Sequence, residues 1–429
     1  MMSKMKETDL GLIPESWDLQ ILGDLLYIKG RIGWKGLKKS EYIEEGYAII
    51  NGEQIKNDKV NWNTVGRISK ERFLESPEII LKENDILMTK DGTIGKIAYI
   101  DHLHEDATVA SGVFVIRKES NLLDTKYLYN FFRSRYFKWL IKGRTEGSVI
   151  PHLYQRDFKE MMIPLPSFEE QKAIAKVITA FDDKIELLQA QNKTLETIAQ
   201  TIFKEWFGKY QIGDELPEGW RVGELGELIE KTIDNRGKTP PLSNDERHLM
   251  LVTYQMNRKT PFPNFSQNSK KKYVSSDIYN SGFRSGHPEY LDILFATVGN
   301  GIPNWCFMPK NEGLYCVAQN FVAFRAKSKI SGIYLKYFFD TRTFKGLVNG
   351  IIITTAQPSI KLSHLRLLEI IIPKQELIDT FNSTTKPMVE LIFNNITQIQ
   401  SLEKTRDTLL PKLMNGQVRV NNIKQTADA

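Results

Sequence analysis

The sequence is poor in cysteine and lacks any long apolar run. Its 429 residues include two cysteines, Cys306 and Cys316, which lie too far apart for a Cys-x-x-Cys pair and are too few to form a thiolate cage around a metal. We interpret them as reduced, partly buried residues of a cytoplasmic protein. No stretch of about 18 uncharged apolar residues occurs, and residues 1–10 carry charges where a signal peptide has its apolar core. The sequence therefore argues against a disulfide scaffold, a zinc ribbon, a membrane span and secretion.

A strong excess of one sign of charge is also missing. The chain has 58 Lys and Arg against 52 Asp and Glu, a net charge of +6, which is mildly basic for this length and does not by itself indicate nucleic-acid binding. The distribution is more informative, because residues 29–39 contain several glycines and no acidic residue. This composition predicts a flexible basic loop that includes Arg31, Trp34, Lys35, Lys38 and Lys39.

Known catalytic patterns are absent from the sequence too. Gly92 and Gly95 have two residues between them, whereas a phosphate-binding loop needs four, so this segment predicts a strand turn. Thr239-Pro240-Pro241-Leu242 lacks the polar and aromatic residues with which amino-methyltransferases hold a base. Residues 101–106 offer possible metal ligands, but nothing elsewhere is spaced to complete a coordination shell. We therefore predict no catalytic or metal-binding residue, and this favours a binding scaffold over an enzyme.

The chain does contain an internal repeat. Ile13-Pro14-x-x-Trp17 near the start returns as Leu216-Pro217-x-x-Trp220 in the second half. Further matches, in the same order along both halves, are Asp85-Ile86-Leu87 with Asp292-Ile293-Leu294, Tyr127-Leu128 with Tyr334-Leu335, Pro151 with Pro358, and Leu195-Glu196 with Leu402-Glu403. Because the matches recur in order, we infer that the chain consists of two similar halves.

Each half is predicted to combine strands with helices. Short β-branched segments bounded by Gly, Asn or Asp predict strands at residues 79–81, 86–88, 96–100 and 113–117. Aromatic and basic residues alternate at 127–139 and again at 334–345. These two stretches predict one amphipathic helix in each half, with aromatic residues toward the core and basic residues available for phosphates.

A long helix is predicted after the first 165 residues. Ser167 and Glu170 have the spacing of a capping box, and no proline interrupts residues 168–207. Seam residues recur at steps of three and four, which is a heptad pattern. The seam positions are Ile174, Ile178, Phe181, Ile185, Leu188, Asn192, Leu195 and Ile202. A helix of about 40 residues would be roughly 60 Å long at 1.5 Å per residue, so it needs an equally long partner.

The second half supplies a candidate partner for this helix. Its seam includes Ile392, Ile399, Leu402 and Leu409, which predicts an antiparallel coiled coil within the chain. Pro387 removes a backbone donor and crowds the preceding turn, so we expect a helix to start near Pro387 with a shorter helix before it. Two independent core helices are the alternative. The predicted fold class is α+β, a mixed α/β chain with two similar domains separated by two long helical regions.

Basic loops are predicted in the second half as well. They are Asn235-Arg236-Gly237-Lys238 and Lys270-Lys271-Lys272. Two modules with basic loops, held apart by a helical rod, would suit a protein that reads two separated DNA half-sites.

Taken together, these features resemble the DNA-specificity subunit of type I restriction-modification systems. The resemblance covers nearly the whole chain, although residues 147–151 and 371–376 depart from the usual pattern. Besides the two Pro-x-x-Trp segments, the matching motifs are Ile163-Pro164-Leu165-Pro166 with Glu169-Glu170-Gln171, Ile202-Phe203-x-x-Trp206-Phe207, Ala356-Gln357-Pro358-Ser359-Ile360, and Leu409-Leu410-Pro411-Lys412-Leu413-x-x-Gly416.

The resemblance implies a domain organisation and a set of partners. It implies target recognition domains at residues 1–166 and 210–373, a central helical spacer at 167–209, a distal helical region at 374–416 and a tail at 417–429. Each recognition domain would read one part of a split, asymmetric site in double-stranded DNA. The helices would dock two adenine-N6 methyltransferase subunits, joined by restriction and translocation subunits. Catalysis, S-adenosylmethionine, Mg²⁺ and ATP would then belong to those partners, with no cofactor in this chain.

The predicted DNA contacts come mainly from basic and amide side chains. Arg or Lys commonly reads guanine and Asn or Gln reads adenine, while most contacts go to phosphate. The candidates are Arg31, Trp34, Lys35, Lys38, Lys39, Lys90, Arg144, Arg236, Lys238, Lys270, Lys271, Lys272, Asn300 and Gln357. Two alternatives stay open. One is a subunit of a related type II-like restriction-methylation enzyme or a fused nuclease or methyltransferase, and the other is an adaptor that binds only proteins.

Overall fold

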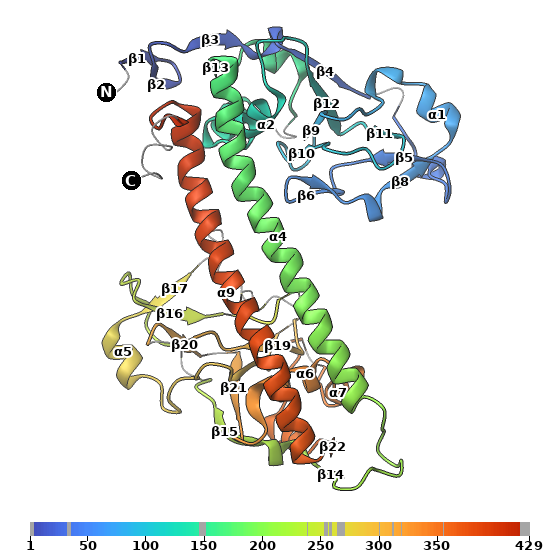
Figure 1. The fold of residues 1–429 in the computed structure, drawn as a ribbon, viewed down its shortest axis with the longest axis vertical. Helices are drawn as coiled ribbons and strands as arrows, with labels where there is room; N and C mark the ends of the chain where they lie inside the picture. The colour runs from blue at the N-terminus through green and yellow to red at the C-terminus, as the bar shows by residue number, and fades with distance from the viewer. Residues whose placement is uncertain are drawn as a thin grey trace. The chain divides into compact units, whose positions relative to one another are not determined.

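The computed structural model divides the chain into two compact units (Figure 1). Unit 1 combines Met1–Asp183 with Glu403–Ala429, and unit 2 is Lys184–Leu402. The structure describes residues 4–31, 36–145, 152–237, 239–252, 256, 260–263, 271–299, 301–310, 313–318, 320–354 and 356–420. Each unit contains one of the repeated halves together with parts of both long helices.

The core of unit 1 contains a four-stranded antiparallel sheet packed on a three-stranded sheet. In spatial order the first sheet is β10 (Ile97–Tyr99), β9 (Ile86–Thr89), β12 (Val113–Lys118) and β4 (Leu26–Gly30). The second is β11 (Ala107–Val109), β5 (Tyr47–Ile50) and β8 (Gly66–Ile68), in which β11 is parallel to β5. Side chains alternate along β9, because Leu87 packs toward the second sheet while Ile86 and Met88 belong to the core on the opposite face.

Two helices cover that opposite face. They are α2 (Thr125–Arg133) and α3 (Arg135–Thr145), whereas the sequence predicted a single helix here. The break has a local cause, because the Ser134 hydroxyl donates to the carbonyl of Phe131 at 2.6 Å and accepts from the amide of Phe137 at 3.2 Å. Ser134 therefore ends one helix and caps the next.

Smaller elements complete unit 1. These are β1 (Met5–Thr8), β2 (Gly11–Pro14), β3 (Asp18–Ile21), β6 (Ile55–Lys56), β7 (Lys59–Val60), α1 (Lys70–Leu74) and β13 (Met162–Leu165). The predicted strands at 86–88, 96–100 and 113–117 are confirmed as β9, β10 and β12. The predicted strand at 79–81 is wrong, because Pro77–Ile79 forms a 3₁₀ turn with the proline at its start, where its fixed φ is favourable.

Unit 2 repeats the topology of the two main sheets of unit 1. Its four-stranded sheet is β15 (Ile229–Ile233), β21 (Phe321–Ala326), β18 (Ile293–Ala296) and β19 (Asn304–Phe307), and its three-stranded sheet is β17 (Lys272–Val274), β16 (His248–Leu251) and β20 (Tyr315–Val317). The remaining elements are β14 (Arg221–Glu224), α5 (Ser276–Ser281), α6 (Ser331–Phe339), α7 (Arg342–Gly350), α8 (Leu362–Arg366) and β22 (Glu369–Ile372). The duplication inferred from the sequence is therefore a duplication of the fold.

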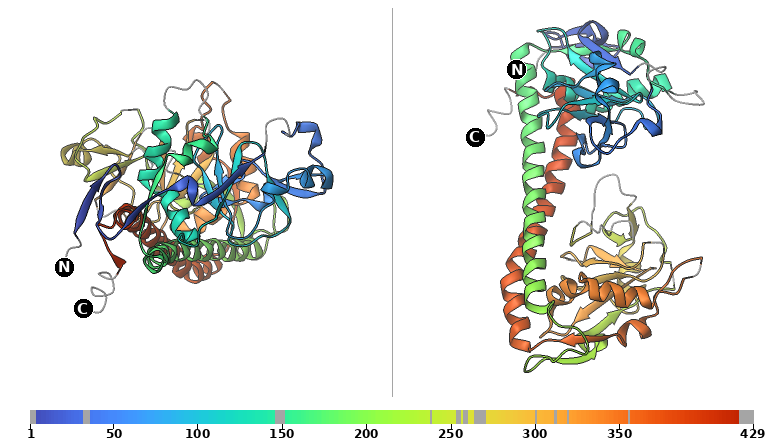
Figure 2. Two further views of the ribbon diagram at one scale, coloured as in Figure 1. Left: turned by 90° about the horizontal axis from the view of Figure 1, so that it is seen from above. Right: turned by 90° about the vertical axis from the view of Figure 1, so that its right-hand side faces the viewer.

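Two helices of 40 residues each contribute to both units. They are α4 (Phe168–Phe207) and α9 (Gln375–Met414), and they lie side by side within each unit in all three views (Figures 1 and 2). Ser167 caps α4 by accepting the amide of Glu170 at 3.4 Å, as predicted. The Glu170 carboxylate does not complete the capping box, because it accepts instead from the Trp17 indole.

Within unit 1 the start of α4 packs on the end of α9. Ile174 and Ile178 share one apolar core with Leu410 and Leu413. Within unit 2 the later part of α4 meets the earlier part of α9, where Ile185, Leu188 and Ile399 cluster beside Leu402. Of the predicted seam, Ile174, Ile178, Ile185, Leu188, Ile392 and Ile399 are buried, and Phe181, Asn192, Leu195, Ile202, Leu402 and Leu409 are half-buried. The pairing is antiparallel in both units, which confirms the coiled coil.

The expected break in α9 at Pro387 is wrong. The helix is continuous from Gln375 to Met414 and passes through Pro387 and Pro411. A proline inside a helix costs about 3 kcal/mol, but Phe381, Val389 and Ile392 on either side of Pro387 are fully buried. Burial of apolar side chains, at about 1.5–3 kcal/mol each, offsets the lost hydrogen bond.

Candidate nucleic-acid interface

A small polar hollow lies at one edge of unit 1, where β5 and β9 both end. Its volume is about 300 Å³, and its lining comes from the segments that follow these two strands. The lining residues are Asn51, Gly52, Glu53, Thr89, Asp91, Gly92, Thr93 and Lys96. The hollow thus brings together side chains and backbone from two different sheets.

The floor of this hollow is the turn between β9 and β10. The Thr89 hydroxyl donates to the carbonyl of Thr93 at 2.6 Å and accepts from the amide of Lys96 at 2.9 Å. Gly92 and Gly95 have φ values of 67° and 80°, a region that favours glycine. The Lys96 ammonium donates to the carbonyl of Gly52 at 3.3 Å, so it bridges the two segments. The glycines therefore serve a strand turn, as the sequence predicted.

Lys90, a predicted DNA contact, lies beside the hollow. Its ammonium sits 5.2 Å from the Phe114 ring centre. Its backbone amide donates to the carbonyl of Gly112, and its carbonyl accepts from the amide of Leu153. These bonds tie the turn to the segment that contains His152 and Leu153. His152 in turn hydrogen-bonds Asp91 through its Nδ1 atom. The sequence did not reveal this pair, because its two members are far apart in the chain.

The equivalent edge of unit 2 gathers other predicted residues. The Arg236 guanidinium donates to the Thr297 hydroxyl at 2.9 Å and pairs with Asp234 at 2.7 Å. Gln357 is exposed in the segment that leads to Ser359, which bridges to Val298 directly after Thr297. Lys238 and Asn300 lie outside the described residues. Arg236 and Gln357 therefore lie on segments that meet at the same edge.

The described residues of the predicted basic loop of unit 1 differ in exposure. Arg31 is only 1% exposed, and its Nε donates to the carbonyl of Val109 at 3.3 Å. Burial lowers the pKa of its guanidinium, and the side chain stands inside the domain and not on a surface loop. Lys38 and Lys39 are exposed at the turn Lys39–Glu41. Trp34 and Lys35 lie outside the described residues.

The other predicted contacts are scattered. Lys271 is exposed and Lys272 half-buried at the start of β17, an edge strand of its sheet. Lys270 lies outside the described residues. Arg144 belongs to α3, and nothing further is described for its side chain. The role of these cations as DNA contacts stays a prediction.

Of the basic residues that were predicted on the aromatic helices, Arg135, Lys138, Arg342 and Lys345 are exposed, whereas Arg133 and Lys336 are held by carboxylates inside their units. Arg133 of α2 binds Asp182 of α4 through two nitrogens, at 2.5 and 3.1 Å, and Asp58 at 3.1 Å. Arg406 of α9 donates to the same Asp182 at 2.8 Å. Burial alone would raise the pKa of Asp182, but the hydrogen bonds and charges of the two arginines lower it. The network fastens α2 to both long helices and leaves Arg133 unavailable for phosphate.

Lys336 plays the corresponding part in unit 2. It is 3% exposed, contacts Glu196 of α4 and pairs with Asp340 at 2.9 Å. Burial lowers the pKa of its ammonium, but the charges of Asp340 and Glu196 outweigh burial and raise it. Tyr337 also donates to Glu196, at 3.0 Å. The expectation that this basic residue is available for phosphates is wrong, because a buried cation needs these local partners.

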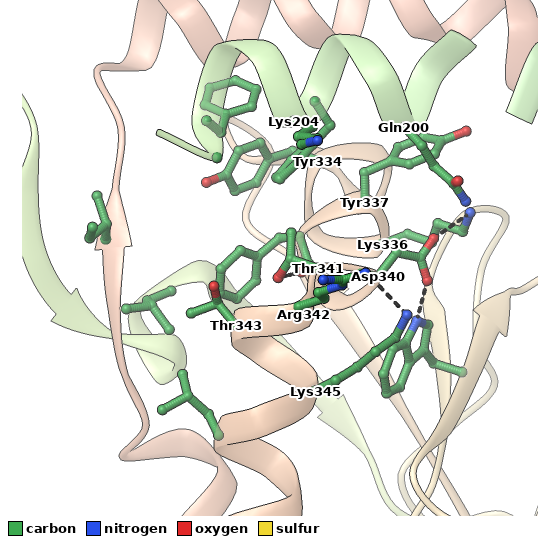
Figure 3. Close-up of a pocket in the computed structure, with 18 of the residues that line it drawn as sticks. Gln200, Lys204, Tyr334, Lys336, Tyr337, Asp340, Thr341, Arg342, Thr343 and Lys345 are labelled. Carbon is green, nitrogen blue, oxygen red and sulfur yellow. Dashed lines mark hydrogen bonds and ion pairs between the residues drawn. The ribbon is translucent and has the colours of Figure 1, made fainter. Parts of the chain in front are cut away.

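These groups form one wall of a larger cavity in unit 2 (Figure 3). Its volume is about 1330 Å³, and it lies between the end of α4, β22 and the helices α6 and α7. Asp340 accepts from the Trp305 indole at 2.9 Å, while Lys204, Arg342 and Lys345 add positive charge to the lining. The aromatic lining includes Phe203, Phe207, Trp220, Trp305, Tyr334, Tyr337 and Phe338. This combination of apolar walls and cations is suited to contact with another molecule.

The remaining chemistry is that of a folded core. Cys306 and Cys316 are free and buried, and burial raises the pKa of both thiols, that of Cys316 to about 12. Over the residues that the structure describes, no group of three His, Cys, Asp or Glu side chains is placed to hold a metal ion. Within the same residues, none of the helices has the length and apolar character needed to cross a bilayer.

Comparisons with known proteins agree with this architecture. Residues 14–197 match the family described as the type I restriction modification DNA specificity domain. The MjaIX specificity subunit of a type I restriction enzyme from Methanocaldococcus jannaschii is 29% identical over 445 residues, which cover 98% of each chain. The HindI specificity subunit from Haemophilus influenzae is 24% identical and covers 79% of this chain and 87% of that protein.

A solved structure shows the same fold. The crystal structure of a type I restriction-modification system S subunit from M. genitalium superposes with a TM-score of 0.59 at 19% identity, over 96% of this chain and 99% of that chain. The similarity extends along both repeated halves and both long helices. Residues 14–197 therefore match the family of type I restriction modification DNA specificity domains, and the chain over nearly its whole length is similar to specificity subunits of type I restriction enzymes.

Proposed function

We propose that the chain reads a bipartite, asymmetric site in double-stranded DNA, one part with each unit. The observation that carries this proposal is the duplicated edge. The same backbone bridge occurs in both units, with Asp91 and His152 on it in unit 1 and Val298 and Ser359 in unit 2. A repeated bridge with different side chains suits a protein that reads two different half-sites, because base edges are distinguished by side-chain donors and acceptors.

The two long helices would set the separation of the half-sites. Their seam is apolar, and Asn395 donates to Asn192 at 2.8 Å across it, an arrangement that favours one register over others. A fixed register would convert helix length into a fixed spacer in the DNA. We further propose that the exposed faces of these helices dock two adenine-N6 methyltransferase subunits, to which restriction and translocation subunits attach.

The chemistry of modification and cleavage would belong to the partners. S-adenosylmethionine would bind the methyltransferase subunits, and ATP and Mg²⁺ the restriction subunits, while this chain supplies sequence recognition without catalysis. In the alternative of a fused nuclease or methyltransferase, the chain itself would turn over. Incubation of the purified chain with DNA and these cofactors separates the two proposals, because turnover after rigorous removal of partner subunits supports only the second.

The central experiment is selection of bound sequences from random DNA duplexes. We expect the chain, assembled with its methyltransferase subunits, to enrich a motif of two specified parts with an unspecified spacer. Exchange of residues 221–372 for those of a relative should change one part and preserve the other. A single continuous motif, or loss of both parts in a folded chimera, would contradict reading by separate units.

A further inference from the structure

We propose that Asp91 and His152 read one base pair of the half-site bound by unit 1. Asp91, oriented by His152, would accept a hydrogen bond from an exocyclic amino group, that of a cytosine or an adenine, at its major-groove edge. The inference rests on the function proposed above and identifies the residues that provide specificity within it.

Asp91 and His152 lie on a backbone bridge that both units share. Asp91 and His152 form an isolated backbone bridge in unit 1, and Val298 and Ser359 form the equivalent bridge in unit 2. Each bridge follows directly on the end of an equivalent strand, β9 or β18. The two units therefore present one backbone position with two different pairs of side chains.

The residues that fasten the starts of these two strands are the same in both units. Asp85, just before β9, binds Arg117 at 2.8 Å, and Asp292, just before β18, binds Arg325 at 2.9 Å. In contrast, the side chains on the bridge differ between the units. Unit 1 has the carboxylate of Asp91 and the imidazole of His152, whereas unit 2 has the isopropyl group of Val298 and the hydroxyl of Ser359. Because Val298 holds the bridge in unit 2, the backbone does not require a carboxylate there. Asp91 is therefore free to serve a purpose other than folding.

The surroundings of Asp91 suit a DNA base. Its side chain is 46% exposed at the rim of the 300 Å³ hollow, and that of His152 is 27% exposed. Cations lie nearby, since Lys90 is adjacent in sequence and the Arg156 guanidinium lies 4.7 Å from the ring centre of Tyr154, whose ring packs at a tilt against that of His152. Such cations attract phosphates. Contact between the Asp91 carboxylate and a DNA phosphate is unfavourable, because both are negatively charged. Contact between this carboxylate and the amino group of a base is favourable, because the amino group donates a hydrogen bond.

The hydrogen bond between Asp91 and His152 determines which of their atoms can accept a hydrogen bond from DNA. The imidazole Nδ1 bonds to one oxygen of Asp91, and with an ionised carboxylate this places the proton on Nδ1. The neutral ring then offers Nε2 as an acceptor, and the second carboxylate oxygen is an acceptor too. The pair thus presents acceptors to the base. In the major groove cytosine N4 and adenine N6 are donors, whereas guanine and thymine present only acceptors and would be repelled.

The test is sequence selection by the full chain assembled with its methyltransferase subunits. We expect the native chain to prefer cytosine or adenine at one position of one half-site by about 5- to 150-fold. Asp91→Asn keeps the shape of the side chain but adds an amide donor, so this preference should fall toward equality or shift to guanine or thymine. The base that is enriched distinguishes cytosine from adenine as the native target.

Two further variants make the test specific. His152→Gln removes the partner that orients Asp91 and should weaken the preference at the same position, with the second half-site unchanged. Val298→Ala, at the matched position of unit 2, should leave the half-site of unit 1 unchanged. An unaltered motif for both Asp91→Asn and His152→Gln, in complexes that still select the other half-site, would overturn the inference. A native complex that selects no motif at all would overturn the proposed function itself.

Discussion

The main sheets of the two units share one topology, but the equivalent tryptophans, Trp17 and Trp220, differ in their burial and in the residues that pack on them. Trp17 is 1% exposed, and its indole donates to Glu170 at 3.1 Å, while Arg419 binds the same carboxylate at 2.8 Å. Trp220 is half-buried, packs beside Phe207 and lines the cavity of unit 2. The difference teaches that a repeated motif marks a repeated position in the fold, whereas its burial depends on what packs over it.

The charged anchors of the long helices differ in the same way. Unit 1 uses two arginines around Asp182, and unit 2 uses one lysine between Glu196 and Asp340. Both arrangements neutralise a buried cation with a carboxylate of α4. The apolar core is therefore repeated in the two units, whereas the ion pairs that hold the long helices differ between them.

The largest effect is expected from truncating the two tryptophans. Trp17→Ala should lower the free energy of unfolding of unit 1 by about 3–5 kcal/mol, because a fully buried aromatic side chain leaves a cavity. Trp220→Ala should lower the free energy of unfolding of unit 2 by clearly less, since the Trp220 ring is partly exposed in the cavity of unit 2. Denaturant unfolding followed in each unit by hydrogen exchange measures both effects. Equal losses would mean that the two tryptophans contribute alike despite their different burial.

Breaking the charged anchor of unit 1 should have the next largest effect. Asp182→Asn removes the carboxylate that Arg133 and Arg406 share and leaves them with Asp58 and Asp407, at a cost of about 2 kcal/mol for this partly buried network. The pKa of Asp182 is lowered in the fold, so its contribution to stability is complete above about pH 4, the unfolded value, and is lost as the pH falls through the folded value. The difference in the free energy of unfolding between the native chain and the Asp182→Asn variant should therefore become smaller below pH 4. A difference independent of pH would rule out this charge as its source.

A smaller effect is expected from the contact between the C-terminal segment and Trp17. Arg419→Ala removes a charged partner of Glu170 and should lower the stability of unit 1 by about 1 kcal/mol, since both side chains are partly exposed. Lys412→Ala, which removes an exposed charge from the same region, is the control and should have no measurable effect. Thermal unfolding of the two variants compares them directly. If the control lost as much stability, net charge and not this contact would be responsible.

The smallest effect concerns DNA and compares the two polar edges. Lys90→Ala should reduce the slope of log affinity against log salt by about one phosphate contact and weaken all sequences uniformly. Arg236→Ala should change the slope less, because Asp234 already neutralises Arg236. Titrations of the assembled complex at several salt concentrations give both slopes. A larger change for Arg236 would show that its pair with Asp234 opens on DNA.

Local patterns in the sequence predicted much of this architecture. The seam from Ile174 to Ile202 identified α4, because heptad spacing depends only on helical geometry and burial. The repeated Asp85 and Asp292 marked equivalent strand starts in the two halves. Pro387 misled the prediction, because its local cost of about 3 kcal/mol is smaller than the gain from burying the surrounding face of α9.

The candidate site was less predictable than the fold. Lys90, Arg236 and Gln357 were found by residue type alone, and the structure places them at the polar edges. Asp91 and His152 were not recognised as a pair, although both were visible in the sequence. Their pairing joins a strand turn to a distant segment, and no periodicity connects such positions.

The sequence by itself therefore determined the duplication, the strand and helix types over most of the chain, and the seam of the coiled coil, since these depend on local spacing of apolar residues. Only the tertiary structure decided which charges are buried, such as Arg31 and Lys336, and which polar groups meet, such as Asp91 and His152. The physical reason is that desolvation and hydrogen bonding depend on every neighbour that packing brings within a few ångströms, and those neighbours come from segments far apart in the chain.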